Sequence, residues 1–267
     1  METIGEENVV IDEIGNMKNE DKQSTETPME LDESPKKSLT IIFCIPGNNF
    51  SNNFLYSWTE LFGFCLLNNI NPILSNSYDS NVFFVRNKCL MGNVLKGTTQ
   101  KPFQGKIDYD YIMWIDSDQV FNVEMFKRLL SHDVDVVSGC YLMANAKHYA
   151  AVKELDNPYL LKNGTYEFLT KQSIDSWRNM EENKDKTLME VAYCGLGFML
   201  MKKGILEQLE YPWFKPAMST IKDENDNILI QDYNSEDFYI CNQINNLGYK
   251  IHLDTSIIVG HEKKLIL

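Results

Sequence analysis

Two aspartates one residue apart, Asp116 and Asp118, form the pair of side chains in this chain that most suggests chemistry. They follow the apolar segment 109–115, a pattern typical of a buried strand that ends where the acids begin. Ligands of open α/β sheets bind beyond the carboxyl ends of the strands, so both carboxylates can project from one turn into that crevice. Their hard oxygens suit Mn²⁺ or Mg²⁺. A solvated turn is the alternative for so short a pattern.

A second acidic pair, Glu236 and Asp237, opens the predicted helix 236–247. Asp237 is the first candidate for a general base that removes a proton from an attacking hydroxyl, and Glu236 is the second. Favourable pairing of acids with the positive end of a helix is the competing explanation. His261 follows Gly260 near the end of the chain, where its imidazole would complete a metal shell, touch a diphosphate or serve only the structure.

Other residues are candidates for contact with a phosphorylated ligand. Arg86 and Asn87 are expected to begin a helix after the second strand, where a guanidinium and free N–H groups favour anions, unless Arg86 is a surface arginine. Asp79 in the preceding loop can accept from a base or a ribose hydroxyl, or simply form a turn. Gly195 and Gly197 lie in a strand pattern and would let a ligand approach the backbone, unless they mark a bulge.

The elements that must position these side chains alternate between strand and helix. Predicted strands cover 39–45, 71–75, 109–115, 134–139, 190–201 and 250–253, and predicted helices cover 54–66, 85–94, 123–130 and 236–247. The expected helix caps are Ser51 or the asparagines after it, Asn122 and Ser235. Segment 145–185 should form loops and short strands. This alternation predicts one α/β domain over 39–267, with a mostly parallel sheet flanked by helices.

Composition narrows the classes of protein. The formal charge of −13 and the lack of a basic block argue against a nucleic-acid partner. The six cysteines are scattered without a CxxC pair, which predicts buried free thiols in a reducing compartment. Residues 1–38 are acidic and polar, typical of a disordered tail. With no signal-peptide core and no apolar run that could span a bilayer, we expect a soluble, cytoplasmic protein.

Taken in order, these pieces resemble the GT-A fold glycosyltransferases, and more narrowly a soluble, non-processive member that is family-two-like. The residues that carry the resemblance are Pro46-Gly47, Arg86-Asn87, Trp114-Ile115-Asp116-Ser117-Asp118, Gly195-Leu196-Gly197-Phe198, Ser235-Glu236-Asp237-Phe238 and Val259-Gly260-His261. The likeness covers nearly everything after residue 38.

The resemblance implies transfer of a sugar from a nucleotide-diphosphate sugar to a hydroxyl of a glycan, protein or small-molecule acceptor. Asp118 would bind manganese directly, Asp116 would contact ribose or the metal, and His261 would complete the metal shell. Asp237 would be the base of an inverting displacement, although a retaining outcome stays open. The implied donor contacts are Pro46, Asp79, Arg86, Asn87, Asp116, Ser117, Gly195 and Gly197.

The chain departs from the processive synthases of that broad family. It has no Gln-x-x-Arg-Trp element after Glu236-Asp237 and no membrane helices, which favours an enzyme that adds one sugar. A nucleotidyltransferase is one alternative, but such enzymes normally carry a Gly-rich phosphate loop near the first strand, for which Pro46-Gly47-Asn48-Asn49 is a poor substitute. A non-catalytic module that binds a glycan or a partner is the other alternative.

Overall fold

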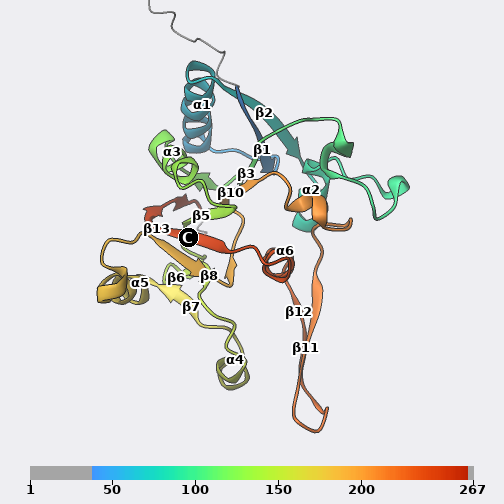
Figure 1. Cartoon of the computed structure of the whole chain (residues 1–267), viewed down its shortest axis with the longest axis vertical. Coiled ribbons are helices and arrows are strands. Elements are labelled where there is room, and N and C mark those ends of the chain that lie inside the picture. Colours follow the sequence, from blue (N-terminus) through green and yellow to red (C-terminus); the bar gives the residue numbers. More distant parts are fainter. Residues whose placement is uncertain (1–37, 264–267) are drawn as a thin grey trace, which may run out of the picture. The chain divides into compact units, whose positions relative to one another are not determined.

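A mixed β-sheet forms the centre of the computed structural model, which describes residues 38–263 (Figure 1). Two of its strands, β10 and β8, run antiparallel to their neighbours, and the others run parallel, so the prediction of a mostly parallel sheet is confirmed. Across the sheet the seven strands are β2 (Ile70–Ser77), β1 (Leu39–Pro46), β3 (Tyr111–Ile115), β10 (Phe198–Lys202), β5 (Val136–Cys140), β13 (Ile251–Ile258) and β8 (Leu188–Val191).

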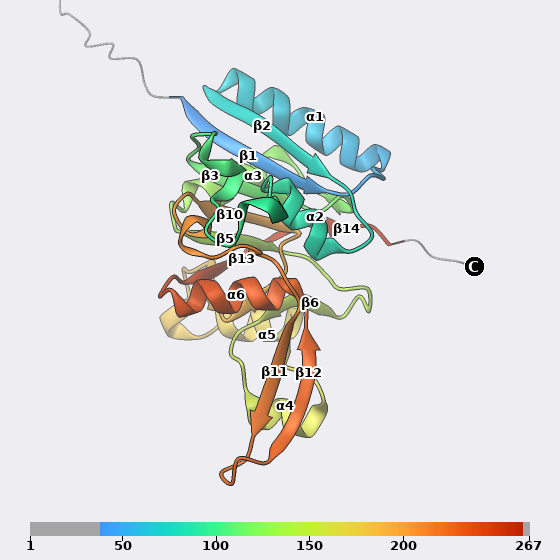
Figure 2. The ribbon, with the colours of Figure 1, turned by 90° about the vertical axis from the view of Figure 1, so that its right-hand side faces the viewer.

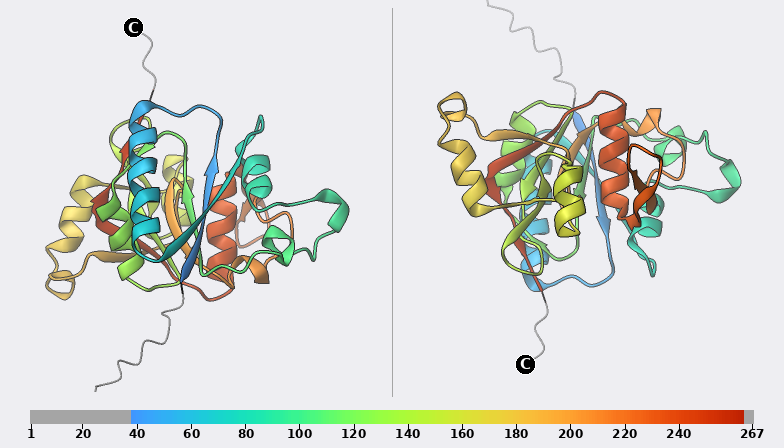
Figure 3. Two further views of the ribbon diagram at one scale, coloured as in Figure 1. Left: turned by 90° about the horizontal axis from the view of Figure 1, so that it is seen from above. Right: turned by 90° about the horizontal axis from the view of Figure 1, so that it is seen from below.

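Helices cover both faces of this sheet, as the sequence predicted (Figure 3). Helices α1 (Asn52–Leu67) and α3 (Val123–Ser131) pack on one face, and α2 (Val82–Cys89) and α6 (Glu236–Asn246) pack on the other. Because side chains alternate along a strand, Phe43 of β1 joins the core under α1 and α3, while Cys44 joins the core under α2 and α6. Burial on both faces explains the continuous apolar run of β1.

The predicted caps are confirmed at three helices. Ser51, Asn122 and Ser235 each accept a hydrogen bond from a backbone N–H in the first turn of α1, α3 and α6. The predicted start of the second helix is wrong, because α2 begins at Val82 and already ends at Cys89. Its first residues are apolar and aromatic, and the side chain of the N-cap residue Asn81 makes no capping hydrogen bond.

Two further predictions need correction. The single strand expected over 190–201 is divided into three: β8 and β10 occupy separate positions in the main sheet, and β9 (Tyr193–Cys194) belongs to a smaller sheet. Segment 145–185 contains β6 (His148–Val152) and β7 (Phe168–Thr170), but also two helices that the sequence did not predict, α4 (Asn157–Asn163) and α5 (Lys171–Arg178).

Smaller units surround the main sheet. Strands β7, β6 and β9 form a three-stranded sheet, and β4 (Gln119–Val120) pairs with β14 (Gly260–His261). The hairpin of β11 (Ala217–Lys222) and β12 (Ile228–Asn234) projects from the body of the fold, and it was not predicted (Figure 2). Short 3₁₀ helices lie at Val94–Lys96, Pro102–Gly105, Glu181–Asn183 and Leu206–Gln208.

The six cysteines are buried and unpaired, as predicted, and the reducing compartment stays a prediction. None of the helices within residues 38–263 is long and apolar enough to cross a membrane. The disordered tail predicted for residues 1–38 falls, except for Ser38, outside the residues that the structure describes.

Candidate active site

A pocket lies where the strand order of the sheet reverses. Strand β1 pairs with β2 on one side and with β3 on the other, so the carboxyl ends of β1 and β3 form a topological switch point, the usual ligand site of open α/β sheets. The pocket there has a volume of about 280 Å³. It is lined by Pro46, Gly47, Tyr78, Asp79, Val82, Val85, Asp116, Ser117 and Asp118. Five predicted site residues therefore surround one cavity.

A glycine allows the two loops of this pocket to meet. Gly47 follows β1 with a φ of +134°, and a Cβ atom at this position would lie 2.5 Å from Oγ of Ser117. A larger residue would push the loop after β1 away from the acidic turn after β3. Pro46 and Gly47 therefore line the pocket where the loop after β1 meets Ser117.

Backbone pairing brings His261 to the acidic turn. The N–H of Asp116 donates to the carbonyl of Gly197 at 3.0 Å, which anchors the start of the turn. Strand β4 then pairs with β14, with Gln119 opposite His261. The N–H of Glu262 also donates to the carbonyl of Asp118 at 2.8 Å. Residues 143 positions apart in the sequence are therefore neighbours.

Asp118 has two cationic or potentially cationic neighbours. Its Oδ2 lies 3.1 Å from Nε2 of His261 and 2.7 Å from Nζ of Lys263. Partial burial alone would raise the pKa of Asp118, but the hydrogen bonds from His261 and Lys263 lower that pKa to about 2. Burial would lower the pKa of His261, but its hydrogen bonds to Asp118 and to the carbonyl of Leu142 raise it. Asp118 is thus ionised at any working pH.

The orientation of His261 fits a cation beside Asp118. Nδ1 of the ring lies 2.6 Å from the carbonyl oxygen of Leu142, and this contact requires a proton on Nδ1. Nε2 then faces the carboxylate of Asp118. When the ring is doubly protonated, Nε2 donates a hydrogen bond to this carboxylate; when the ring is neutral, the lone pair of Nε2 can bind a metal ion. Within residues 38–263, no group of three or more His, Cys, Asp or Glu side chains is arranged to hold a metal.

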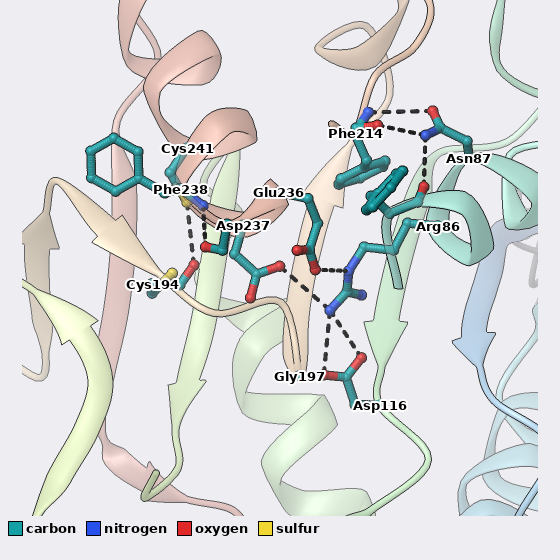
Figure 4. Close-up of polar contacts among 12 residues, drawn as sticks. Arg86, Asn87, Asp116, Cys194, Gly197, Phe214, Glu236, Asp237, Phe238 and Cys241 are labelled. Atoms are coloured by element: carbon teal, nitrogen blue, oxygen red, sulfur yellow. Dashed lines mark hydrogen bonds and ion pairs between the residues drawn. The ribbon is translucent and has the colours of Figure 1, made fainter. Parts of the chain in front are cut away.

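Asp116 belongs to a different cluster, centred on Arg86 (Figure 4). Nη2 of Arg86 lies 3.1 Å from Oδ1 of Asp116 and 3.5 Å from Oδ1 of Asp237, and Nε lies 3.4 Å from Oε1 of Glu236. The guanidinium also stacks over Trp114, with Cζ 5.5 Å from the ring centroid. Arg86 therefore connects the acidic turn after β3 to the start of α6.

One buried cation faces three carboxylates in this cluster. Burial would lower the pKa of Arg86, but Asp116, Asp237 and Glu236 raise it, so the guanidinium stays charged. Burial also raises the pKa of Asp237 to about 8, and the charges of Glu236 and Asp116 act in the same direction, against the influence of Arg86. Asp237 is therefore a carboxyl poised near neutral pH, as a general base requires.

Arg86→Met should be strongly destabilising, because it leaves three acids together without their cation. Removing one partner of a buried ion pair costs about 3–5 kcal/mol, and we expect about 3 kcal/mol at pH 7 because a carboxyl can take up a proton instead. Urea denaturation measures the loss. Lys88→Met is the control: the side chain of Lys88 is 51% exposed in its pair with Asp79, so its loss should cost less than about 1 kcal/mol. Equal losses would contradict the central role of Arg86.

The pKa of Asp237 also predicts a pH dependence of stability. Between about pH 4 and pH 8 the folded state keeps a proton on Asp237 that the unfolded state releases, so the free energy of unfolding falls as pH rises. Asp237→Asn removes this contribution. Relative to the natural chain, the variant should gain about 1 kcal/mol or more from pH 5 to pH 8 in urea denaturation. A difference that does not change with pH would contradict this assignment.

Several predicted donor contacts have other partners. Arg86 is wrong as the start of a helix, because it lies in the second turn of α2 and is buried. The side-chain amide of Asn87 donates to the carbonyls of Phe83 and Phe214, and its oxygen accepts from the N–H of Phe214. Asn87 therefore connects α2 to the backbone at Phe214 by hydrogen bonds. Asp79 lines the pocket but pairs with Lys88.

Gly195 and Gly197 lie in the turn between β9 and β10, not inside a strand as predicted. Their free space is filled by Tyr141: a Cβ atom on Gly195 would lie 1.9 Å from its hydroxyl oxygen, and one on Gly197 would lie 2.9 Å from its ring. The N–H of Gly197 donates to that hydroxyl at 3.2 Å. Close approach of the Tyr141 side chain is sufficient to explain these glycines, and their contact with a donor stays a prediction.

Two residues of the site, Lys263 and Tyr141, were not predicted. Lys263 contacts Asp118, and its only signal was its position two residues after His261. Tyr141 packs edge-on against the ring of His261, with centroids 5.2 Å apart. An aromatic residue just after the buried strand β5 was a readable signal for a side chain near the strand ends.

Comparison with known proteins adds little to this geometry. No protein-family model matches the chain, and no curated protein matches it in sequence. Similar solved structures include A197 from STIV, with 19% identity and a TM-score of 0.46 over 85% of this chain and 86% of that one. They also include GalNAc-T7 with UDP, GalNAc and Mn²⁺, with 12% identity and a TM-score of 0.47. That alignment covers 85% of this chain but only 43% of the GalNAc-T7 chain.

Proposed function

We propose that this chain is a metal-dependent GT-A fold glycosyltransferase, which moves a sugar from a nucleotide-diphosphate sugar to an acceptor hydroxyl. The observation that carries the proposal is the placement of two acidic clusters side by side at the carboxyl ends of the strands. One contains Asp118 and His261, and the other contains Asp116 and Asp237, joined by Arg86. These contacts support a donor site and a base that would lie next to each other, since Arg86 contacts both Asp116 and Asp237.

The donor would occupy the pocket at the switch point. Asp116, Ser117, Asp79 and Pro46 would line its nucleoside end, because these residues surround that pocket. Asp118 and His261 would hold Mn²⁺ or Mg²⁺ together with oxygens of the diphosphate, and Lys263 would leave Asp118 when the cation binds. When bound, the cation would neutralise charge that develops on the departing nucleoside diphosphate.

Asp237 would receive the proton of the acceptor hydroxyl. Its raised pKa suits this task, because a base near neutrality can both exist in the ionised form and accept a proton. Arg86 would hold Asp237 and Asp116 at a fixed separation. Its positive charge would also offset the negative charge of each carboxylate when it is ionised. Attack from the side of Asp237 would invert the anomeric configuration, which NMR analysis of the product measures directly.

A nucleotide-sugar assay tests the proposal. The protein is incubated with a panel of nucleotide sugars and Mn²⁺, and release of nucleoside diphosphate is measured with and without a chelator. We expect release from at least one donor and its loss on chelation. No release together with no donor binding would overturn the proposal. Release of pyrophosphate from a nucleoside triphosphate and a sugar phosphate would indicate a nucleotidyltransferase instead.

A further inference from the structure

A second pocket lies between the turn after α4 and the hairpin β11–β12, and it reaches the start of α6. Figure 2 shows α4 next to this hairpin. The volume of the pocket is about 440 Å³. Ser235, which caps α6, and Phe238, which follows Asp237, both line it. In Figure 4 the carboxylate of Asp237 points toward Arg86, while the ring of Phe238 lies on the other side. Asp237 thus lies in the chain between two residues that line this pocket, with its carboxylate on the Arg86 side.

Aromatic rings form one wall of this pocket. The rings of Tyr166 and Phe238 are nearly parallel, with centroids 5.7 Å apart and planes at 10°. Tyr193 packs on Phe238 at 6.0 Å, and Phe168 meets Tyr193 edge-on at 6.1 Å. These rings support one another and are half-buried, so the wall is already formed without a ligand.

The hairpin forms the opposite wall, and its polarity changes along its length. Two cross-strand pairs of the hairpin line the pocket: Ser219 lies opposite Asp232, and Ile221 lies opposite Ile230. Asn234, next to the cap of α6, also lines the pocket. At about 3.4 Å per residue, Ile230 lies about 14 Å from Asn234 along the strand. The wall is thus polar near Asp237 and apolar far from it.

The charge of the lining restricts the ligand. Among the described residues that line this pocket, none is a lysine or arginine, and Asp232 is the ionisable acid. An anionic ligand would meet Asp232 without a compensating cation, so the pocket suits a neutral molecule. Hydroxyl groups of such a molecule would find partners in Asp232, Asn234 and Ser219 at the end nearest Asp237.

We infer that this pocket is the acceptor site, and that the acceptor is a neutral glycoside with an apolar aglycone. This inference rests on the function proposed above. The sugar lies between the aromatic wall and Asp232, with its reacting hydroxyl toward Asp237, and the aglycone packs on Ile221 and Ile230. The hydroxyl oxygen bonds to the anomeric carbon of the donor as the bond to the diphosphate oxygen breaks. The hydroxyl proton goes to Asp237, and the electron pair leaves with the nucleoside diphosphate.

Matched glycosides test the inference. Phenyl and methyl β-glycosides of glucose, galactose, N-acetylglucosamine and mannose are titrated in pairs by saturation-transfer NMR, without a donor. For at least one sugar, burial of the phenyl ring should make the phenyl glycoside bind about tenfold tighter than the methyl glycoside. Ile230→Ser should remove this preference. Leu229→Ser is the matched control, because Leu229 is the adjacent residue of the hairpin, is 48% exposed and does not line the pocket.

Other outcomes overturn the inference. Equal binding of the phenyl and methyl members, or equal effects of the Ile230→Ser and Leu229→Ser substitutions, excludes an aglycone site at the hairpin. Binding of serine- or threonine-containing peptides in place of the glycosides indicates a protein acceptor. If the chain cleaves nucleotide sugars but ignores the phenyl glycosides, the inference fails and the proposed function stands. If phenyl glycosides bind but no nucleotide sugar is cleaved, the function fails and the acceptor role fails with it.

Discussion

Asp237→Asn is expected to lower kcat by about 10²- to 10⁴-fold while donor affinity changes by less than about threefold. Asparagine has the same shape as aspartate but does not accept the acceptor proton at working pH. Asp237 lies in the Arg86 cluster and not among the residues that line the switch-point pocket, so donor binding should not depend on it. Single-turnover kinetics gives the chemical step, and calorimetry with the donor gives the affinity.

Glu236→Gln is the matched control for this prediction. Glu236 also contacts Arg86, through Nε, but its side chain is 9% exposed against 17% for Asp237. A more enclosed carboxylate is less accessible to an incoming hydroxyl, so Glu236→Gln should retain more activity. If Glu236→Gln were the more damaged variant, the role of base would pass to Glu236. A kcat for Asp237→Asn within tenfold of the natural chain would remove Asp237 from the mechanism.

The pH profile gives an independent check on the same residue. Because kcat/KM reports the free enzyme, it should rise with pH as Asp237 loses its proton, with a midpoint near its pKa of about 8. In Asp237→Asn this rise should disappear, and the residual rate should be flat over that range. A profile in the natural chain that is already level at pH 6 would show that a different group, with a lower pKa, controls the reaction.

Local patterns were enough to locate the acidic turn. The apolar run before Asp116 and Asp118 predicts a buried strand, and α/β alternation places its carboxyl end beside that of β1. The caps Ser51, Asn122 and Ser235 could be predicted because a helix start is decided by side chains within three residues. These features depend on short stretches of chain, so one sequence is sufficient to find them.

The partners of Arg86 could not be predicted, because they depend on tertiary packing. Arg86 is separated by 30 residues from Asp116 and by 150 from Glu236, and no spacing rule relates them. The helix that carries it packs on the sheet with this side chain inward, where the guanidinium stacks on Trp114. Only the packing of α2 and α6 on the same face of the sheet makes this arginine the centre of three acids.

The hairpin is different, because its signal was present and overlooked. Its two strands flank a turn in which Asp223 accepts from the backbone N–H groups of Asn225 and Asn227, a typical use of aspartate in a tight turn. The first flanking segment contains the β-branched residues Thr220 and Ile221, and the second has Ile228 and Ile230 at alternate positions. No element was predicted between the strand pattern that ends at 201 and the helix that begins at 236, so one wall of the second pocket was missed.

Asp118→Ala is expected to weaken Mn²⁺-dependent donor binding by about 100-fold or more, because a direct metal ligand should matter at least as much as the groups that orient it. The carboxylate of Asp118, with a pKa of about 2, is the ionised group that His261 and Lys263 both contact. Without it, His261 would be the remaining side chain of the proposed cation site. Calorimetry of a cleaved nucleotide sugar with Mn²⁺, and then with a chelator, separates metal-dependent from metal-independent binding.

Lys263→Ala should act in the opposite direction, which makes it a demanding control for Asp118→Ala. The ammonium of Lys263 lies 2.7 Å from Oδ2 of Asp118, where it competes with a metal ion for the same oxygen. Its removal should therefore tighten binding of Mn²⁺, measured as loss of the free-ion signal in electron paramagnetic resonance. General damage to the fold would weaken binding in both variants, so opposite signs can arise only if Asp118 and Lys263 share the cation position. Unchanged Mn²⁺ and donor affinity in Asp118→Ala would remove the cation from this site altogether.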